Sequence, residues 1–196
     1  MARMTREESQ ALTRAKLISV AQTLFTRDGY AATSLDQIAE TAGFSKGAVY
    51  SNFEGKEELF LEVLEEHGRL SLSGILAVVN SAQSIDDAIE RIAQWSEKSS
   101  RKGNWPTLIL EYSRQAKPTA SFRKSQEKVL RAQWRALGEQ LLNLDDTPAT
   151  KKLAPETVGA LIFELTYAPA MSFVSQPTSG DLLRVALRGV FGSANP

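Results

Sequence analysis

Apolar residues recur at helical spacing along most of this chain. In residues 5–28 they fall three or four positions apart, which places them on one face of an α-helix. Similar stripes or helix-start signals occur in residues 34–42, 46–52, 57–80, from 84, from 104, and in 119–142, 155–174 and 181–191. The pattern predicts an all-α chain of about nine helices.

Residues 34–53 (SLDQIAETAGFSKGAVYSNF) form the stretch around which the other segments are organised. Ser34 and Ser45 are typical N-cap residues, and each precedes a short segment with an apolar face. Gly43 lies between the two segments, where glycine commonly ends a helix. We therefore predict two short helices joined by a tight turn, and call this stretch motif 34–53.

The second helix of the motif has a face suited to the DNA major groove. Lys46, Gly47, Tyr50 and Ser51 are expected to point outward, and the groove, about 12 Å wide, presents donors, acceptors and thymine methyl groups. Free backbone N–H groups at the two helix starts are natural phosphate sites. Lys56 opens the next helix, and its position fits either a bound phosphate or pairing with a neighbouring Glu.

The same residues belong to a longer pattern, Gly29-Tyr30-x-x-Thr33-Ser34-x-x-x-Ile38-Ala39-x-x-Ala42-Gly43-Phe44-Ser45-x-Gly47-x-x-Tyr50-x-x-Phe53-x-x-Lys56-Glu57-x-Leu59. It resembles the N-terminal signature of the tetracycline-repressor (TetR) family of bacterial regulators. The resemblance covers about residues 10–65 and implies a DNA-binding helix-turn-helix. It departs from the family at Phe44, where Val is commoner, and at Asn52, where His or Tyr is frequent. The implied DNA-binding residues are Thr33, Ser34, Ser45, Lys46, Gly47, Tyr50, Ser51 and Lys56.

Past Leu59 the resemblance extends only to the general helical layout of such regulators. We expect residues 1–58 to form a three-helix DNA-binding domain, and residues 59–196 to form a helical domain for effector binding and dimerisation. The second domain is rich in large aromatic side chains, which build either small-molecule pockets or plain bundle cores. The pocket candidates are Trp95, Trp105, Tyr112, Phe122, Trp134, Phe163 and Tyr167.

Residues 101–135 are strongly basic, with nine Lys and Arg residues against Glu111 and Glu127. Three interpretations remain open: a site for an anionic effector, pairing with the Glu-rich helix 57–80, and a solvated helix face. Residues 1–56 are nearly neutral, with seven basic and six acidic residues. One copy of the chain should therefore bind DNA weakly.

The last two predicted helices are apolar on nearly every side, and such helices must be covered all round. We therefore predict a homodimer through these helices, and Pro169 predicts a kink in the first of them. The expected dimer interface contains Leu161, Leu165, Phe173, Leu183, Leu187 and Val190.

Composition restricts the remaining possibilities. The chain has no Cys and a single His, so metal sites and nucleophilic catalysis by these residues are not expected, and neither is a cofactor. No transmembrane run or secretory signal is recognised, and a cytoplasmic protein is the simplest interpretation. The expected function is a regulator, most simply a repressor, that a small molecule releases from a palindromic double-stranded DNA operator. The competing hypotheses are an activator, a protein-interaction module with a vestigial helix-turn-helix, and a small helical enzyme.

Overall fold

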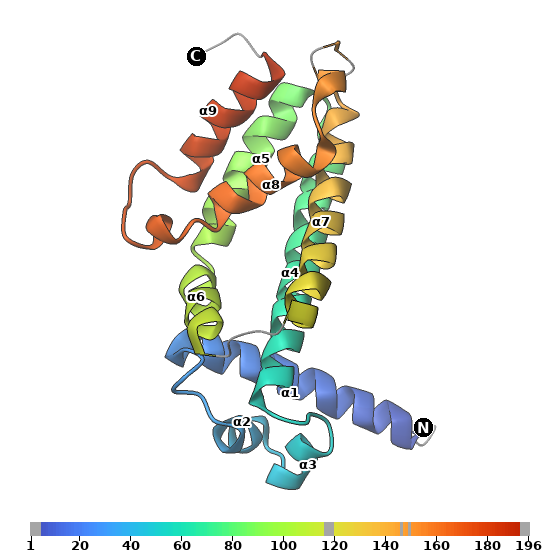
Figure 1. Ribbon diagram of the computed structural model, residues 1–196, viewed down its shortest axis with the longest axis vertical. Helices are drawn as coiled ribbons and strands as arrows, with labels where there is room; N and C mark the ends of the chain where they lie inside the picture. Colours follow the sequence, from blue (N-terminus) through green and yellow to red (C-terminus); the bar gives the residue numbers. More distant parts are fainter. Residues whose placement is uncertain (1–4, 116–119, 146, 149, 193–196) are drawn as a thin grey trace. The chain divides into compact units, whose positions relative to one another are not determined.

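The computed structural model describes residues 5–115, 120–145, 147–148 and 150–192, apart from the side chains of 120–122, 125, 171 and 172. These residues form an all-α fold, as predicted, with no strand among them (Figure 1). The α-helices are α1 (Arg6–Asp28), α2 (Leu35–Ala42), α3 (Lys46–Tyr50), α4 (Lys56–Asn80), α5 (Ile85–Ser100), α6 (Trp105–Gln115), α7 (Ala120–Leu142), α8 (Pro155–Thr166) and α9 (Ser179–Phe191). Two short 3-10 helices are η1 (Thr150–Lys152) and η2 (Pro169–Ser172).

The prediction for the eighth helix was wrong at its end. We expected a kinked helix to residue 174, but α8 ends at Thr166. Ala168 is extended, with φ −59° and ψ 126°, and Pro169 begins η2. A proline disfavours helical backbone at the residue before it, so Pro169 follows the end of this helix and does not bend it.

The chain divides into two compact units. The first comprises Met1–Arg69 and Thr107–Lys117, and the second comprises Leu70–Pro106 and Pro118–Pro196. The boundary therefore falls within α4 rather than after residue 58. Most of α6 belongs to the first unit, which the sequence pattern did not indicate.

An aromatic cluster forms the centre of the first unit. The rings of Phe25, Tyr30, Phe60 and Tyr112 come from α1, the turn after it, α4 and α6, with neighbouring centroids 4.7–5.8 Å apart. Most of these pairs meet edge to face, the arrangement that the ring quadrupoles favour. The cluster is buried and therefore fixes α6 against α1 and α4 in this unit.

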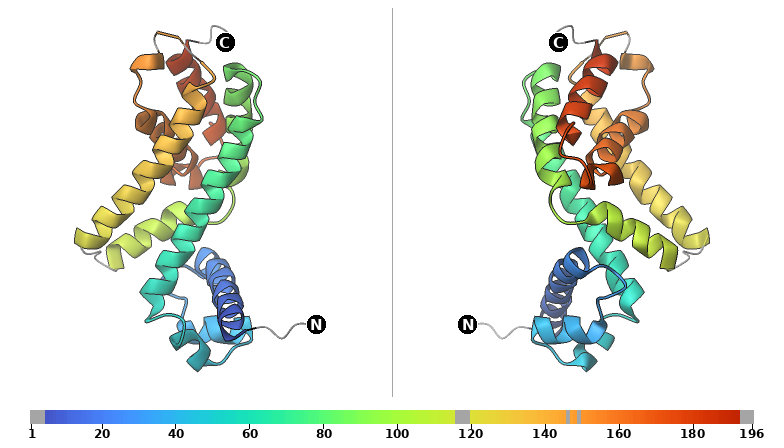
Figure 2. Two further views of the ribbon diagram at one scale, coloured as in Figure 1. Left: turned by 90° about the vertical axis from the view of Figure 1, so that its right-hand side faces the viewer. Right: turned by 90° about the vertical axis from the view of Figure 1, so that its left-hand side faces the viewer.

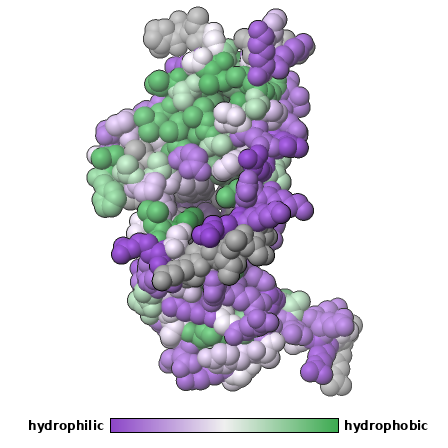
Figure 3. All heavy atoms as spheres, in the orientation of Figure 1, coloured by the Kyte–Doolittle hydropathy of each residue, from purple (hydrophilic) through white to green (hydrophobic). Residues whose placement is uncertain are grey.

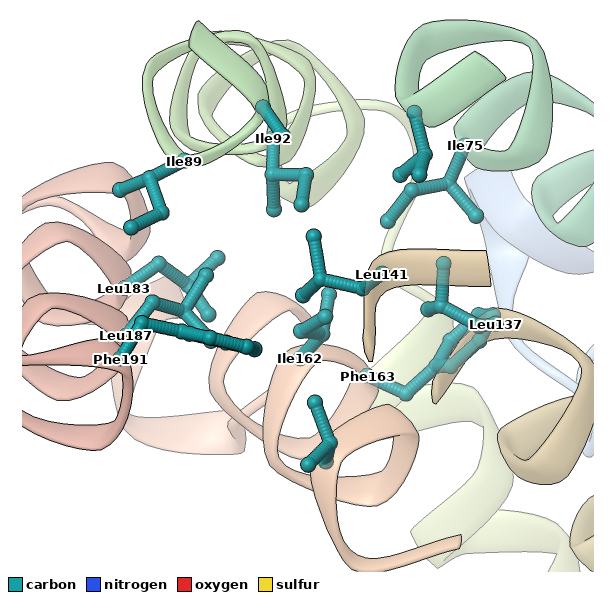
Figure 4. Close-up of a cluster of buried hydrophobic side chains, with 13 residues drawn as sticks. Ile75, Ile89, Ile92, Leu137, Leu141, Ile162, Phe163, Leu183, Leu187 and Phe191 are labelled. Atoms are coloured by element: carbon teal, nitrogen blue, oxygen red, sulfur yellow. The ribbon is translucent and has the colours of Figure 1, made fainter. Parts of the chain in front are cut away.

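Aliphatic side chains fill the core of the second unit. Figure 4 shows Ile89 and Ile92 of α5 facing Leu183 and Leu187 of α9. Ile162 of α8 lies among them, and all five side chains are at most 1% exposed. Burial of several such residues from three helices supplies most of the stabilising free energy of a small helical domain.

Helices α7 and α8 approach each other at two glycines. A Cβ atom at Gly159 would overlap the backbone of Trp134, and one at Gly138 would overlap the backbone of Pro155. Neither position can accept a side chain unless the helices separate. The two glycines therefore set the distance between α7 and α8.

Polar side chains join α5, α8 and α9. Thr166 and Ser179 are both buried, and the hydroxyl oxygen of each lies 2.9 Å from the hydroxyl oxygen of Ser96. Arg184 of α9 donates to both carboxylate oxygens of Glu90 at 2.9 Å and to Glu97 at 3.0 Å.

None of the described helices is long and apolar enough to cross a membrane.

We predict that Gly159→Ala lowers the free energy of unfolding by about 1–3 kcal/mol or more, because its methyl group requires the backbones of α7 and α8 to move apart. Urea unfolding followed by circular dichroism measures the change. Gly55→Ala is the control, since its Cβ would meet no atom within 4 Å, and should change stability by less than about 1 kcal/mol. Equal effects from both substitutions would contradict the close approach.

We also predict a pH-dependent contribution from Arg184. Its hydrogen bonds lower the pKa of Glu90 to about 2 in the folded chain, against an ordinary value of 4.5. A lowered pKa means that this contribution is fully present above pH 4.5 and is lost as the pH falls towards 2. The stability difference between wild type and Arg184→Gln should therefore shrink as the pH falls through this range. Arg91→Gln, which removes the more exposed pair with Asp87, is the comparison and should show a smaller change in the same direction, because Arg91 also lowers the pKa of Asp87. A stability difference between wild type and Arg184→Gln that does not change with pH would contradict the prediction.

Candidate nucleic-acid interface

The two short helices of motif 34–53 begin and end where local signals place them. The Ser34 and Ser45 hydroxyl oxygens accept the N–H groups of Gln37 at 3.1 Å and Ala48 at 3.2 Å. The Gly43 N–H donates to carbonyl groups in the last turn of α2. Helices α2 and α3 lie next to each other and beside α1, the arrangement of a helix-turn-helix (Figures 1 and 2).

One face of α3 packs and the other is open. Val49 and Phe53 are 0% and 2% exposed, while the Tyr50 side chain is 60% exposed. Lys46 and Gly47 are also exposed. Ser45 and Ser51, at the two ends of α3, are exposed as well. That these groups contact DNA stays a prediction.

Lys46 forms an ion pair with Asp36 of α2. Both side chains are exposed, at 68% and 54%. The hydrogen bond that its amine donates to Asp36 raises the pKa of Lys46, so the amine carries its positive charge at neutral pH. Asp36 was not among the residues that the sequence singled out.

Thr33 differs from the other predicted contacts because it is buried, with 1% exposure. Its hydroxyl donates to the Gly29 carbonyl at 2.8 Å. Its side chain therefore holds the turn before α2 and offers no hydroxyl to solvent. Ser34, the next residue, is exposed.

The amine of Lys56 contacts groups of its own unit, whereas the sequence suggested a bound phosphate or pairing with a neighbouring Glu. Its amine donates to the Ala31 carbonyl at 3.2 Å and lies 4.4 Å from the centroid of the Tyr30 ring. Burial lowers its pKa. The ammonium group therefore anchors the turn between α1 and α2 to the start of α4.

Arg14 of α1 braces the end of motif 34–53. Its guanidinium donates to the Asn52 carbonyl and to Glu62, and it lies 4.2 Å from the centroid of the Phe53 ring. Sequence reasoning missed this role, because Arg14 and Asn52 are far apart in the chain. Arg14 thus connects three parts of the first unit: α1, the segment that follows α3, and α4.

Glu111 of α6 clasps the turn between α1 and α2. Its carboxylate accepts the backbone N–H groups of Tyr30 at 3.0 Å and Ala31 at 2.8 Å. Gly29 has φ +89°, and a Cβ there would stand 2.9 Å from the Glu111 Oε2 atom. The adjacent Tyr112 hydroxyl donates to Glu57 at 2.8 Å. The available sequence signal was an isolated acid within a basic segment.

The aromatic pocket candidates do not all lie in one unit. Tyr112 belongs to the aromatic cluster of the first unit, whereas Trp95, Trp134, Phe163 and Tyr167 pack in the second. Phe163 and Tyr167 stack with centroids 6.4 Å apart, and the Tyr167 hydroxyl lies 3.0 Å from that of Ser71. Trp105 is buried, and the side chain of Phe122 lies outside the described residues.

The residues expected at a dimer interface are also distributed unevenly. Leu183 and Leu187 are fully buried within this chain, so they present no surface to a second copy. Leu161, Leu165 and Val190 are half-buried, and Phe173 is 84% exposed. Val185, which the sequence did not single out, is 77% exposed on α9.

The basic residues of α7 lie at the surface. Arg131 donates to Glu127 and to Glu156 at the start of α8, and Arg135 donates to the same Glu156.

Burial lowers the pKa of His67, in α4, to about 4, which keeps it neutral at physiological pH. Among the residues described here, no group of three or more His, Asp or Glu side chains could hold a metal ion.

Comparison with known proteins agrees with this geometry. Residues 17–63 match the family described as "Bacterial regulatory proteins, tetR family". The HTH-type transcriptional regulator AcrR of Shigella flexneri is 45% identical over 65 residues, covering 33% of this chain and 30% of AcrR. The HTH-type transcriptional activator FasR of Mycolicibacterium smegmatis is 33% identical over 92 residues, covering 45% of this chain and 42% of FasR. The chain thus matches less than half the length of either relative.

The similarity of fold extends further. The crystal structure of a transcriptional regulator from Saccharomonospora viridis in complex with choline superposes with a TM-score of 0.66. It is 16% identical, and the match covers 94% of this chain and 97% of that one. This likeness concerns the fold alone. The segment that contains the helix-turn-helix, residues 17–63, is thus similar to the tetR family of bacterial regulatory proteins.

Proposed function

We propose that this chain is a ligand-responsive transcriptional regulator that binds double-stranded DNA as a homodimer. The observation that carries the proposal is the open face of α3, where Lys46, Gly47 and Tyr50 are exposed above buried Val49. A helix with small and hydrogen-bonding groups on its open side fits the major groove. The serine-capped starts of α2 and α3 support phosphate contacts beside it.

The placement of charge limits the affinity of a single copy. Arg14, Arg27 and Lys46 are each paired with a carboxylate, and Lys56 is held by the Ala31 carbonyl. Such pairing reduces the charge available to neutralise phosphates. Binding two half-sites about one helical turn apart adds the contributions of two copies. A palindromic operator is therefore part of the proposal.

The exposed apolar face of α9 supports the dimer. Hydrophobic residues gather on the α8 and α9 face of the second unit (Figure 3). Leu182, Val185 and Gly189 share one side of α9, opposite the buried Leu183 and Leu187. Exposed apolar patches of this kind commonly mark interfaces between proteins. The interface that we propose is centred on Val185, with Leu161, Leu165, Phe173 and Val190 around it.

A small-molecule effector is the proposed signal. The structural relative from Saccharomonospora viridis was solved with choline, and the second unit here contains the Phe163, Tyr167 and Ser71 group. Helices α4 and α6 each contain residues of both units, so a change in the second unit reaches the first through continuous backbone. An effector that favours one conformation shifts the population towards it.

The chain could act as a repressor or as an activator. Release from an operator by the effector makes the chain a repressor, which is the interpretation that we favour. The match to FasR, which is named an activator, supports activation as the alternative. A protein-interaction module with a vestigial helix-turn-helix is the second alternative, and the paired cations of the first unit are the observation that favours it.

DNA binding is tested with DNA from the regions that flank the chain's own gene. The double variant Lys46→Ala, Tyr50→Phe should weaken binding about tenfold or more in a gel-shift titration, because it removes a cation and a hydroxyl from the α3 surface. Lys152→Ala removes the same charge from an exposed site in the second unit and should bind as the wild type does. If the double variant bound as tightly as the wild type, the assigned contacts would be wrong.

The dimer is tested by size-exclusion chromatography with light scattering. Wild-type chain should elute as a dimer at micromolar concentration, and Val185→Glu should yield monomer because it buries a charge at the proposed interface. Leu12→Glu introduces the same charge at a 59% exposed position of α1 and should remain dimeric. A monomeric wild type would refute the proposed assembly.

A further inference from the structure

Lys46 is the single basic residue of motif 34–53, which also contains Asp36 and Glu40. In the structure Lys46 is the first residue of α3, and Asp36 lies in the first turn of α2. Their ion pair joins the two helices at the surface that we propose faces DNA. The one cation on this surface is therefore already engaged by an acid.

The position of Asp36 is not required for capping α2. Ser34 provides the N-cap, and its hydroxyl accepts the Gln37 N–H. An acid in the first helical turn is favourable in general because it complements the helix dipole. The Asp36 carboxylate additionally points at the amine that we assign to DNA contact. Helix stability alone leaves this second contact unexplained.

The pair is suited to exchange. Both side chains are more than half exposed, and exposed ion pairs are weak because water and salt screen them. A DNA phosphate or base-edge oxygen offers Lys46 an equivalent acceptor. The carboxylate then remains beside DNA without its cation, which opposes binding.

We propose that Asp36 is an internal competitor of DNA for Lys46 and thereby sets the affinity of the interface. This inference rests on the proposed DNA-binding function. In the free chain Asp36 holds Lys46 near the open face of α3. In the complex Lys46 exchanges the carboxylate for an acceptor on DNA, and the displaced negative charge lowers the net gain.

Competition between Asp36 and DNA for Lys46 changes how binding depends on salt. Each phosphate neutralised by a cation contributes about −0.9 to the slope of log affinity against log salt concentration. With Asp36 beside it, Lys46 contributes less than one net charge. Asp36→Asn, which retains the size of the side chain, should steepen the slope by up to about 0.9 per bound chain and tighten binding about three- to tenfold at low salt.

Fluorescence anisotropy over a sodium chloride series tests this, with a duplex that the wild-type chain selects from a random-sequence library. Glu40→Gln is the matched control: it removes an equal charge from the exposed side of α2 one turn away, and Glu40 is not the partner of Lys46. Asp36→Asn should exceed this control in both affinity and slope. In a Lys46→Met background the excess should vanish. Thermal unfolding of each variant verifies that it is folded.

The possible outcomes distinguish failure of DNA binding from failure of the competitor role of Asp36. If the wild-type chain selects no duplex, the proposed function fails and the competitor role fails with it. If the wild type binds but Asp36→Asn matches Glu40→Gln, or binds more weakly than wild type, the competitor role alone is overturned. An excess that persists in the Lys46→Met background also overturns it.

Discussion

The turn between α1 and α2 is the constraint on which the candidate DNA interface depends. Glu111 holds two of its N–H groups, Lys56 holds a carbonyl, and the Tyr30 ring is enclosed by the aromatic cluster. These contacts come from α6 and α4, so several elements determine the direction in which α2 leaves α1. The orientation of α3 follows from that direction, because α2 and α3 pack together.

Local signals in the sequence predicted motif 34–53 well. Serine caps and helix-ending glycines act over three or four residues, and the structure contains them as expected. The contacts of Glu111 could not be predicted, since they join residues about eighty positions apart. The apolar stripe of α9 likewise indicated burial without distinguishing a chain's own core from a partner. Only the packed structure separates Leu183, which is buried, from Val185, which is exposed.

Charge in the first unit serves the fold before it serves recognition. Lys56 was one of the predicted DNA-binding residues and Arg14 is another cation of the first unit, yet each is engaged by neighbouring groups of its own unit. This arrangement gives a preorganised surface with little net charge. In the proposed complex with DNA, discrimination among sequences would depend on how the groups of α3 fit, because a weak background attraction leaves less affinity for arbitrary DNA.

The two glycine contacts between α7 and α8 have a mechanical consequence. Where backbone meets backbone at Gly138 and Gly159, neither helix can rotate about its axis or slide without collision. Helices α7 and α8 therefore have to move together as one rigid body. Any displacement of the two helices changes the conformation of the segments that flank them. The same contacts restrict sequence change over evolutionary time, since a side chain at either position would force α7 and α8 apart.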